Sequence, residues 1–253
     1  MATPSLSLSS SPVSLLPTLS SLPHKPKTLN LKPLSLSYKR RHLTSLHLHC
    51  APSISTSLLV THQDLNERDW SFVEPPSEHP RQQLRQVINS ASLPSFSRVL
   101  VALPTPRFID ELLDPVHGAE PQHVVAYHES LLMLSNVKES RDEVRCFQGD
   151  VTTVPAKFAP FDAIFVCYFP GMGVSVGELL RSHASLCSSG SRVVIFVEQG
   201  RGTIKIHRQQ FPDMVTSDLP DLKTVEKAAA TNGFKIIEFV DEPTFYVAVL
   251  GLL

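Results

Sequence analysis

The chain has 253 residues, of which 42% are hydrophobic and 7% aromatic, enough for the core of one α/β domain. Its formal net charge is −1, but six of its 23 basic residues precede Asp64, the first acidic residue. The part of the chain from Asp64 onward therefore has 17 basic and 24 acidic residues, a net charge of about −7. A mildly acidic domain repels a phosphate backbone, which disfavours RNA or DNA as the main ligand.

Residues 1–50 are predicted to be a plant chloroplast transit peptide that is removed from the mature protein. They are rich in Ser, Leu and Pro, contain no acid, and carry their first basic side chain at Lys25. Such a composition cannot bury a core, and its prolines would break the amphipathic helix typical of a mitochondrial presequence. A disordered tail is the alternative interpretation. Residues 51–80 read as a polar linker, so we expect a folded domain over residues 81–253 in the chloroplast stroma.

Strands and helices alternate through the remaining chain. Apolar residues at Leu84, Val87 and Ile88 are spaced as on one face of a short helix over 81–91. A nearly continuous apolar run over 161–168 is typical of a central strand covered on both faces. The other expected strands are 98–102, 123–127, 143–147, 191–197, 234–240 and 245–252, and the other expected helices are 108–113, 130–138, 176–186, which Gly190 ends, and 222–231.

This alternation predicts a doubly wound, mostly parallel sheet with helices on both faces. The last two strands are joined only by residues 241–244. Parallel neighbours need a crossover of roughly a dozen residues, so this pair must be antiparallel. We therefore expect a Rossmann-like α/β fold with a seven-stranded sheet that ends in an antiparallel hairpin.

Neither a metal site nor a membrane span is expected. The four cysteines are widely separated, without a Cys-x-x-Cys pair, and Cys146 and Cys167 fall in predicted strands as small buried hydrophobes. No run approaches the ~18 continuous apolar residues that cross a bilayer.

Several segments, in this order and spacing, resemble the class I S-adenosyl-L-methionine-dependent methyltransferases, in particular the type 11 branch that includes quinone-biosynthesis enzymes. Gly149-Asp150 resembles the segment whose acid contacts the adenine ring, and Phe161-Asp162 matches the opening of the family's fourth strand. Three further matching segments are 123–134, 187–195 and 230–237. The resemblance covers roughly residues 84–250. It implies the class I methyltransferase fold and S-adenosyl-L-methionine as cofactor, bound over the ends of the first four strands.

The chain departs from the family in the loop after its first strand. The family has a Gly-x-Gly loop there, because backbone N–H groups and absent Cβ atoms let the cofactor approach closely. Here the loop contains Pro104 and Pro106, which have no backbone N–H and whose rings fill space. One donor lost near a charged ligand costs about 1–3 kcal/mol. Two losses and a steric clash are expected to weaken cofactor binding by on the order of a hundredfold.

The resemblance also implies which residues would hold the cofactor. The family's ribose-binding acid aligns with His128, which is not an acid. Glu129, one residue later, takes this role if the strand ends there. Otherwise Glu129 is a solvated acid in the first turn of a helix. Asp150 is the candidate for the adenine ring, or else an ordinary turn or N-cap aspartate. The full candidate set is Leu103, Thr105, His128, Glu129, Asp150 and Val151.

Three residues are candidates for substrate binding. Tyr168 and Gly171 follow the fourth strand, where many methyltransferases keep substrate-facing groups, although a tight turn is the alternative. Arg201 follows the fifth strand and could bind an acidic substrate, or be a solvated loop arginine. An inserted loop is expected within residues 111–122. No catalytic base is identified, and many methyl transfers depend mainly on positioning.

Two functions stay open from the sequence. The first is a chloroplast methyltransferase acting on a small-molecule or lipid-like acceptor. The second is a catalytically inactive, methyltransferase-like scaffold or assembly factor with a plastid protein partner, which the two loop prolines favour. An NAD(P)-dependent oxidoreductase is a third reading, without support from the C-terminal hairpin. Fold cannot decide between the first two, because function resides in the site.

Overall fold

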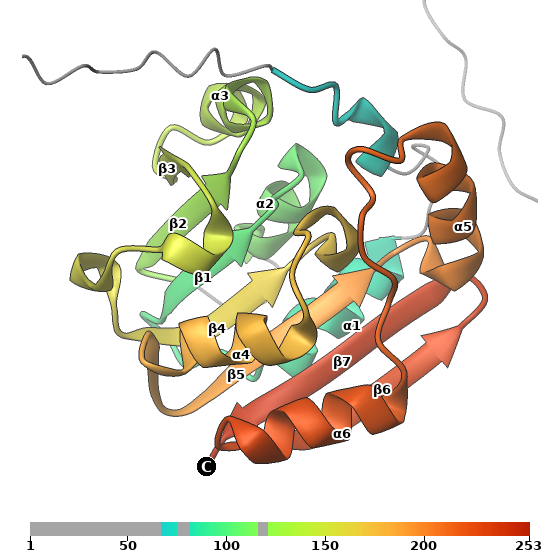
Figure 1. Ribbon diagram of the computed structural model, residues 1–253. Helices are drawn as coiled ribbons and strands as arrows, with labels where there is room; N and C mark the ends of the chain where they lie inside the picture. Colours follow the sequence, from blue (N-terminus) through green and yellow to red (C-terminus); the bar gives the residue numbers. More distant parts are fainter. Residues whose placement is uncertain (1–66, 75–80, 116–120) are drawn as a thin grey trace, which may run out of the picture. The chain divides into compact units, whose positions relative to one another are not determined.

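The computed structural model describes residues 67–74, 81–115 and 121–253 (Figure 1). The strands are β1 (Arg98–Ala102), β2 (His123–His128), β3 (Arg145–Gln148), β4 (Phe161–Val166), β5 (Cys187–Val197), β6 (Phe234–Glu242) and β7 (Phe245–Leu252). The helices are α1 (Arg81–Ser90), α2 (Pro106–Leu112), α3 (Leu131–Ser140), α4 (Val176–Ala184), α5 (Gly200–Gln210) and α6 (Leu222–Thr231). Short 3-10 helices are η1 (Ser71–Val73), η3 (Val151–Thr153), η4 (Ala156–Phe158) and η5 (Phe169–Gly171). The predicted transit peptide lies outside the described residues.

The seven strands form one sheet in the order β3-β2-β1-β4-β5-β7-β6. The first five strands in this order, β3, β2, β1, β4 and β5, pair in parallel. Strand β7 is antiparallel to both of its neighbours, β5 and β6. This arrangement confirms the predicted seven-stranded, mostly parallel sheet with a C-terminal antiparallel pair. No helix among the described residues is long and apolar enough to cross a bilayer.

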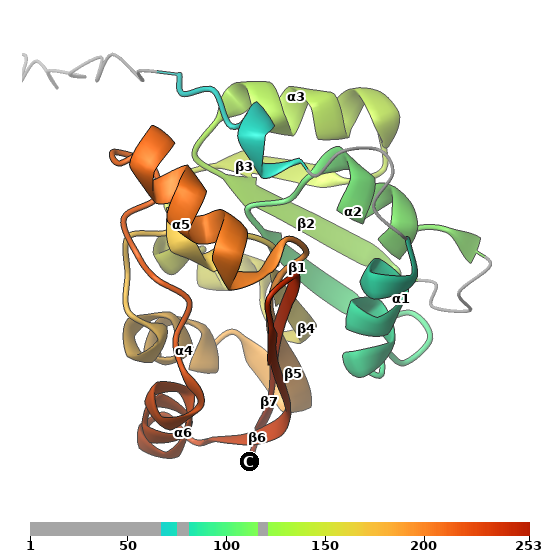
Figure 2. The same cartoon turned by 90° about the vertical axis from the view of Figure 1, so that its right-hand side faces the viewer.

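Helices cover both faces of the sheet (Figure 2). Side chains of β1 alternate between the two faces, as the two-residue period of a strand requires. Val99 and Val101 pack in one apolar cluster with α1 and α2, whereas Leu100 and Ala102 pack in the other with α4, α5 and α6. Both faces of the central strands are therefore buried, which explains their nearly continuous apolar sequence.

Side-chain caps determine where several helices begin. Ser130 caps α3 by accepting a hydrogen bond from Met133 N, and Asp221 caps α6 in the same way. Ser175 and Glu178 form a reciprocal capping box at the start of α4. These caps satisfy N–H groups that the first helical turn leaves without partners, so the helices start where the sequence places a short polar residue.

The expected role of Gly190 was wrong. Helix α4 ends at Ala184, and Gly190 lies inside β5 with φ at +77°. The pairing of β5 with β4 is irregular here, because Phe161 pairs with Cys187 and Ala163 already pairs with Arg192. The glycine thus supplies the left-handed backbone of a bulge rather than the end of a helix.

Helix α5 was not predicted, since its first residues were taken as a loop. Its N-cap, Gln199, makes no side-chain capping bond, and two glycines occupy its first turn, so the usual start signals are missing. Gly200 has φ at +65°, and a Cβ there would lie 2.4 Å from the carbonyl oxygen of Pro243. A glycine is required because the helix begins directly against the turn between β6 and β7.

A loop lies between α2, which ends at Leu112, and β2, which begins at His123, and its residues 116–120 lie outside the described residues. One further expectation changes. Residues 67–74, which fall in the predicted polar linker, pack against the domain instead: Trp70 is 2% exposed and Val73 is also buried. We call residues 67–74 the plug segment.

Candidate functional site

The turn after β1 keeps a left-handed corner without a glycine. Leu103 has φ at +53° and its N–H donates to the carbonyl oxygen of Tyr127 at 2.9 Å. Thr105 caps α2 by accepting a hydrogen bond from Phe108 N, and Pro106 is the first residue of that helix. The predicted cofactor residues Leu103 and Thr105 therefore shape the corner and start the helix.

The end of β2 offers a neutral histidine instead of an acid. His128 is buried, and its Nδ1 accepts a hydrogen bond from Ser130 N at 2.9 Å. Burial lowers the pKa of His128 to about 4, so the ring is uncharged at neutral pH. Glu129, the alternative ribose ligand, is about half exposed, and its carboxylate lies 3.9 Å from the guanidinium of Arg68 in the plug segment.

Asp150 and Val151 lie at the start of η3, beyond β3. One oxygen of the Asp150 carboxylate accepts hydrogen bonds from both the N–H and the hydroxyl of Thr152, each at 2.7 Å. Asp150 is exposed, whereas Val151 is buried in the apolar core. Asp150 thus acts as an N-cap in this structure, and its contact with an adenine ring stays a prediction.

Beyond β4, the structure brings Tyr168 next to a histidine that the sequence did not single out. The Tyr168 hydroxyl and His207 Nδ1 are 2.9 Å apart, and both residues are buried. Burial raises the pKa of Tyr168 and lowers that of His207. His207 was not predicted as a site residue because it lies on α5, the helix that was not predicted.

The indole of Trp70 lies between the ends of β2 and β4. Its ring meets that of His128 edge-on, with centroids 5.1 Å apart. On the other side it contacts Gly171 so closely that a Cβ at this glycine would lie 2.7 Å from the indole. Gly171 is thus required by the tryptophan, and Trp70 lies buried between the end of β2 and the turn after β4.

Phe72 extends the aromatic contact toward α5. It stacks on Phe211 with ring centroids 4.1 Å apart and meets His207 edge-on at 5.0 Å and Tyr168 at 6.0 Å. The carbonyl oxygen of Val73 accepts a hydrogen bond from the side chain of Gln199 at 3.4 Å. The plug segment is drawn in teal between α3 and α5 in Figure 1 and again in Figure 2.

The start of the plug segment is held by the N-terminus of α3. The Glu67 carboxylate accepts hydrogen bonds from Leu131 N at 3.1 Å, from Leu132 N at 3.2 Å and from the Ser130 hydroxyl. Burial raises the pKa of Glu67, but these hydrogen bonds together outweigh it, so the pKa lies below its usual value. A carboxylate at this position suits the partial positive charge of a helix N-terminus.

A buried acid lies at the end of β5. Burial raises the pKa of Glu198 to about 7, against the attraction of the Arg107 guanidinium 3.6 Å away. With Val73, Thr105 and Tyr168, among others, Glu198 lines an enclosed cavity of about 10 Å³, on the order of the smallest space that can hold one water. Between Val73 and Glu198 there is therefore space for about one water.

Arg201, the predicted ligand of an acidic substrate, is already bonded within the fold. Its guanidinium donates to both carboxylate oxygens of Asp241 on β6, at 2.6 and 3.2 Å, and to the carbonyl oxygens of Leu219 and Pro220. It thereby ties the first turn of α5 to β6. It also lines an open cavity of about 700 Å³ between α5 and the segment before α6.

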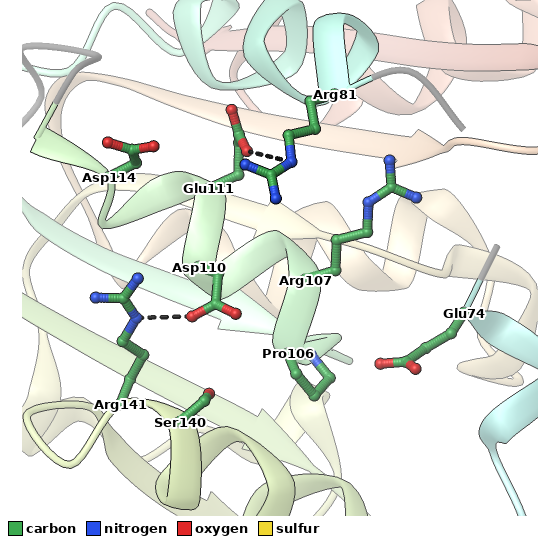
Figure 3. A pocket seen from close by; sticks show the side chains of 9 residues that line it. All are labelled: Glu74, Arg81, Pro106, Arg107, Asp110, Glu111, Asp114, Ser140 and Arg141. Atoms are coloured by element: carbon green, nitrogen blue, oxygen red, sulfur yellow. Dashed lines mark hydrogen bonds and ion pairs between the residues drawn. The ribbon is translucent and has the colours of Figure 1, made fainter. Parts of the chain in front are cut away.

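A second open cavity, of about 650 Å³, lies beside α2 and is lined mainly by charged side chains (Figure 3). Arg141 pairs with Asp110 at 2.7 Å, and Arg81 lies 3.9 Å from Glu111. Figure 3 marks both pairs with dashed lines, and in each pair the acid belongs to α2. Because acids and arginines alternate around it, the cavity presents no surface of one charge for an ionic ligand.

Comparison with known proteins relates the chain to solved structures only. No protein-family model matches the sequence, and no curated protein does. One solved structure with a similar fold is a geranyl diphosphate C-methyltransferase from Streptomyces coelicolor, in complex with Mg²⁺, geranyl diphosphate and S-adenosyl-L-homocysteine (12% identity, TM-score 0.54, covering 74% of this chain and 89% of that chain). A second is an S-adenosylmethionine-dependent methyltransferase from Mesorhizobium loti (14% identity, TM-score 0.52, covering 66% of this chain and 96% of that chain). A third is the YcgJ protein from Bacillus subtilis (16% identity, TM-score 0.52, covering 64% of this chain and 72% of that chain). Together with the strand order, they show that the chain has the class I S-adenosylmethionine-dependent methyltransferase fold.

Proposed function

We propose that this chain is a methyltransferase-like protein that has given up cofactor use and serves in the chloroplast as a binding or assembly factor. The single observation that carries the proposal is the position of Trp70, which lies buried over the ends of β2 and β4. A side chain of the protein itself thus fills the place that the resemblance assigns to S-adenosyl-L-methionine.

Other residues at the ends of β1 and β2 do not fit that nucleotide either. Pro104 and Pro106 remove two backbone donors from the corner after β1. His128 stands where the family has a ribose-binding acid, and its Nδ1 is engaged by Ser130. Glu129 is paired with the plug segment. Filled space, missing donors and a missing acid all weaken the same site, which supports a role without methyl transfer.

Methyl transfer to a small-molecule or lipid-like acceptor is the second candidate function, and one observation favours it. Tyr168 and His207 form a buried polar pair next to Phe72, at a position where the resemblance expects substrate-facing groups. This function requires the plug segment to leave the space that it fills between His128, Gly171 and α5, which we call the groove.

Calorimetric titration of S-adenosyl-L-methionine into the protein separates the two functions. For the wild-type chain we expect no heat of binding up to millimolar cofactor. Micromolar binding that Asp150→Ala abolishes would overturn the proposal. A double variant, Trp70→Ala with Phe72→Ala, is titrated in parallel. Micromolar binding by this variant alone would show a competent site closed by the plug segment, and would establish the second candidate instead.

The chloroplast location is tested independently of the cofactor. The Ser-rich, acid-free residues 1–50 support import and removal of a transit peptide. N-terminal sequencing of the protein isolated from plastids should begin near Ala51. Recovery of the chain with Met1 intact, or only outside plastids, contradicts this part of the proposal.

A further inference from the structure

We propose that the groove occupied by the plug segment is a peptide-binding site, and that the partner is a protein segment with a carboxylate, a tryptophan three residues later and a second aromatic residue two further on. Glu67, Trp70 and Phe72 have this spacing in the plug segment itself. The inference rests on the proposed binding function. It treats the plug segment as a ligand held in cis, which shows the chemistry that the groove selects.

The first subsite selects a carboxylate. Two backbone N–H groups and the hydroxyl of Ser130 converge on Glu67, and Ser130 is itself the N-cap of α3. Three donors on one side chain define both the charge and the position of the group that binds there. The first subsite therefore accepts an Asp or Glu side chain of a partner and rejects a Lys or Arg side chain.

The second subsite selects an indole. It is formed by the ring of His128, which is nearly perpendicular to the indole, and by the bare backbone of Gly171, which leaves room for a flat ring 2.7 Å from where a Cβ would stand. The indole Nε1 is buried without a hydrogen-bond partner among the described residues. The plug segment therefore fills this subsite in shape but leaves a donor unsatisfied, so it is not the tightest ligand that the subsite can hold.

The third subsite selects a second aromatic ring. Phe211 offers a stacking face, and the rings of His207 and Tyr168 lie nearly perpendicular to the ring bound there. Phe72 is only partly buried there. Aromatic side chains of this kind carry much of the binding energy at protein interfaces, because they bury a large area with few rotatable bonds.

The way the plug segment is attached allows exchange. Among the described residues, no backbone–backbone hydrogen bond joins it to the rest of the domain. Its bonds to the domain involve side chains, as in Arg68 to Asp213 O at 3.1 Å and Gln199 to Val73 O. Segments held in this manner open locally without unfolding of the domain. A partner segment that satisfies the same three subsites can therefore replace it.

The test uses the double variant Trp70→Ala, Phe72→Ala of the full chain and a fluorescein-labelled peptide with the sequence of residues 66–74. A cis segment has an effective concentration on the order of 1 mM, so a plug seated about 99% of the time implies a peptide Kd on the order of 10 µM for the open groove. Fluorescence anisotropy should show this affinity for the variant and at least tenfold weaker binding for the wild-type chain. Because Trp70 is the only tryptophan, emission from an unlabelled peptide should shift to shorter wavelength on binding to the variant.

Matched changes locate the binding. In the peptide, Glu67→Gln should weaken binding about tenfold, whereas Glu74→Gln, an equal change of charge outside the three subsites, should not. In the double variant, Gly171→Val should abolish binding, because its side chain fills the indole subsite. Gly177→Ala serves as the control, since a Cβ there makes only ordinary contacts at 3.9 Å or more.

The inference is overturned if the folded double variant does not bind at millimolar peptide, if the wild-type chain binds equally well, or if Gly171→Val has no effect. Circular dichroism checks the fold; if the double variant is unfolded, Phe72→Ala alone is used with the labelled peptide. Concentration-dependent dimers of the wild-type chain, dissolved by the peptide, would assign the groove to a second copy and also overturn the inference. Cofactor binding overturns the proposed function, whereas absence of both cofactor and peptide binding overturns only this inference.

Discussion

Phe72 stacks on Phe211 with the two ring centroids 4.1 Å apart and the ring planes within 13° of each other. The contact joins η1, near the start of the described chain, to the residue that caps the end of α5. With Trp70 on one side and Phe72 on the other, the plug segment spans the space between the β2 end and α5. The site is thus closed by residues that precede the predicted domain.

Replacing Gly171 should displace Trp70. A Cβ at residue 171 lies 2.7 Å from the indole, which is too close for a buried ring to tolerate without movement. We expect Gly171→Ala to shift the emission of the sole tryptophan to longer wavelength and to lower the free energy of unfolding by about 1–3 kcal/mol. Gly177→Ala adds the same methyl group without a close contact, so its emission spectrum should match that of the wild-type chain.

Removing the Glu198 charge should stabilise the protein at high pH. The folded pKa is raised from 4.5 to about 7, so the native state holds its proton more tightly than the unfolded state. The associated stability is complete below pH 4.5 and is lost as the pH rises through 7. At about 1.4 kcal/mol per pH unit, Glu198→Gln should gain up to about 3 kcal/mol over the wild-type chain above pH 7. Urea unfolding at pH 5 and pH 8 measures the difference, and equal gains at both pH values would contradict it.

His128 should produce the opposite dependence on pH. Its folded pKa is lowered from 6.5 to about 4 by burial, so the unfolded state binds the proton more tightly. Stability is complete above pH 6.5 and is lost as the pH falls through 4, by up to about 3 kcal/mol. In the wild-type chain this slope and that of Glu198 oppose each other. Urea unfolding of Glu198→Gln between pH 7 and 4 should show the His128 slope without the opposing slope of Glu198, and adding His128→Gln should make the remaining slope smaller.

Arg201 should prove to be a structural anchor. Its guanidinium makes four hydrogen bonds to Asp241, Leu219 and Pro220. Arg201→Ala is expected to lower the free energy of unfolding by about 1–3 kcal/mol. Arg201→Lys should restore only part of this, because an ammonium group cannot match the paired geometry.

Lys205→Ala is the matched control for Arg201, since Lys205 is an exposed cation on the same helix and lines the same cavity. Its effect on the free energy of unfolding should stay within about 0.5 kcal/mol. If Arg201→Ala unfolds at the same urea concentration as the wild-type chain, the anchoring role is wrong and the predicted substrate role regains support.

Much of the fold could be predicted because it depends on local patterns. The strand over 98–102 and the helix over 222–231 begin and end as expected, since buried strands read as apolar runs and Asp221 marks a helix start. Helix α5 was not predicted, because its start depends on a contact with a distant part of the chain. Glycine at its first residue is selected by contact with Pro243, some forty positions later, and no local pattern reports such a contact.

The site was less accessible to sequence reasoning than the fold. Trp70 and Phe72 lie in a short polar stretch that forms a 3-10 turn, which has no helical or strand periodicity to detect. One signal was present: a lone tryptophan in a polar segment is unusual, because so large an apolar side chain is rarely left in water. The three hydrogen-bond donors to the Glu67 carboxylate come together only when α3 has formed, so this contact could not be predicted from the sequence.

Leu103 carries a consequence for how degenerate members of this fold are recognised. A leucine with φ at +53° sits in a conformation that costs roughly 1–2 kcal/mol, yet the corner persists in a chain whose loop carries Pro104 and Pro106. The bend is thus demanded by the passage from a parallel strand into its crossover helix. A glycine at this position in other sequences therefore indicates first that the backbone must bend there, and only second that a ligand binds. The presence or absence of that one residue is a poor indicator of cofactor binding.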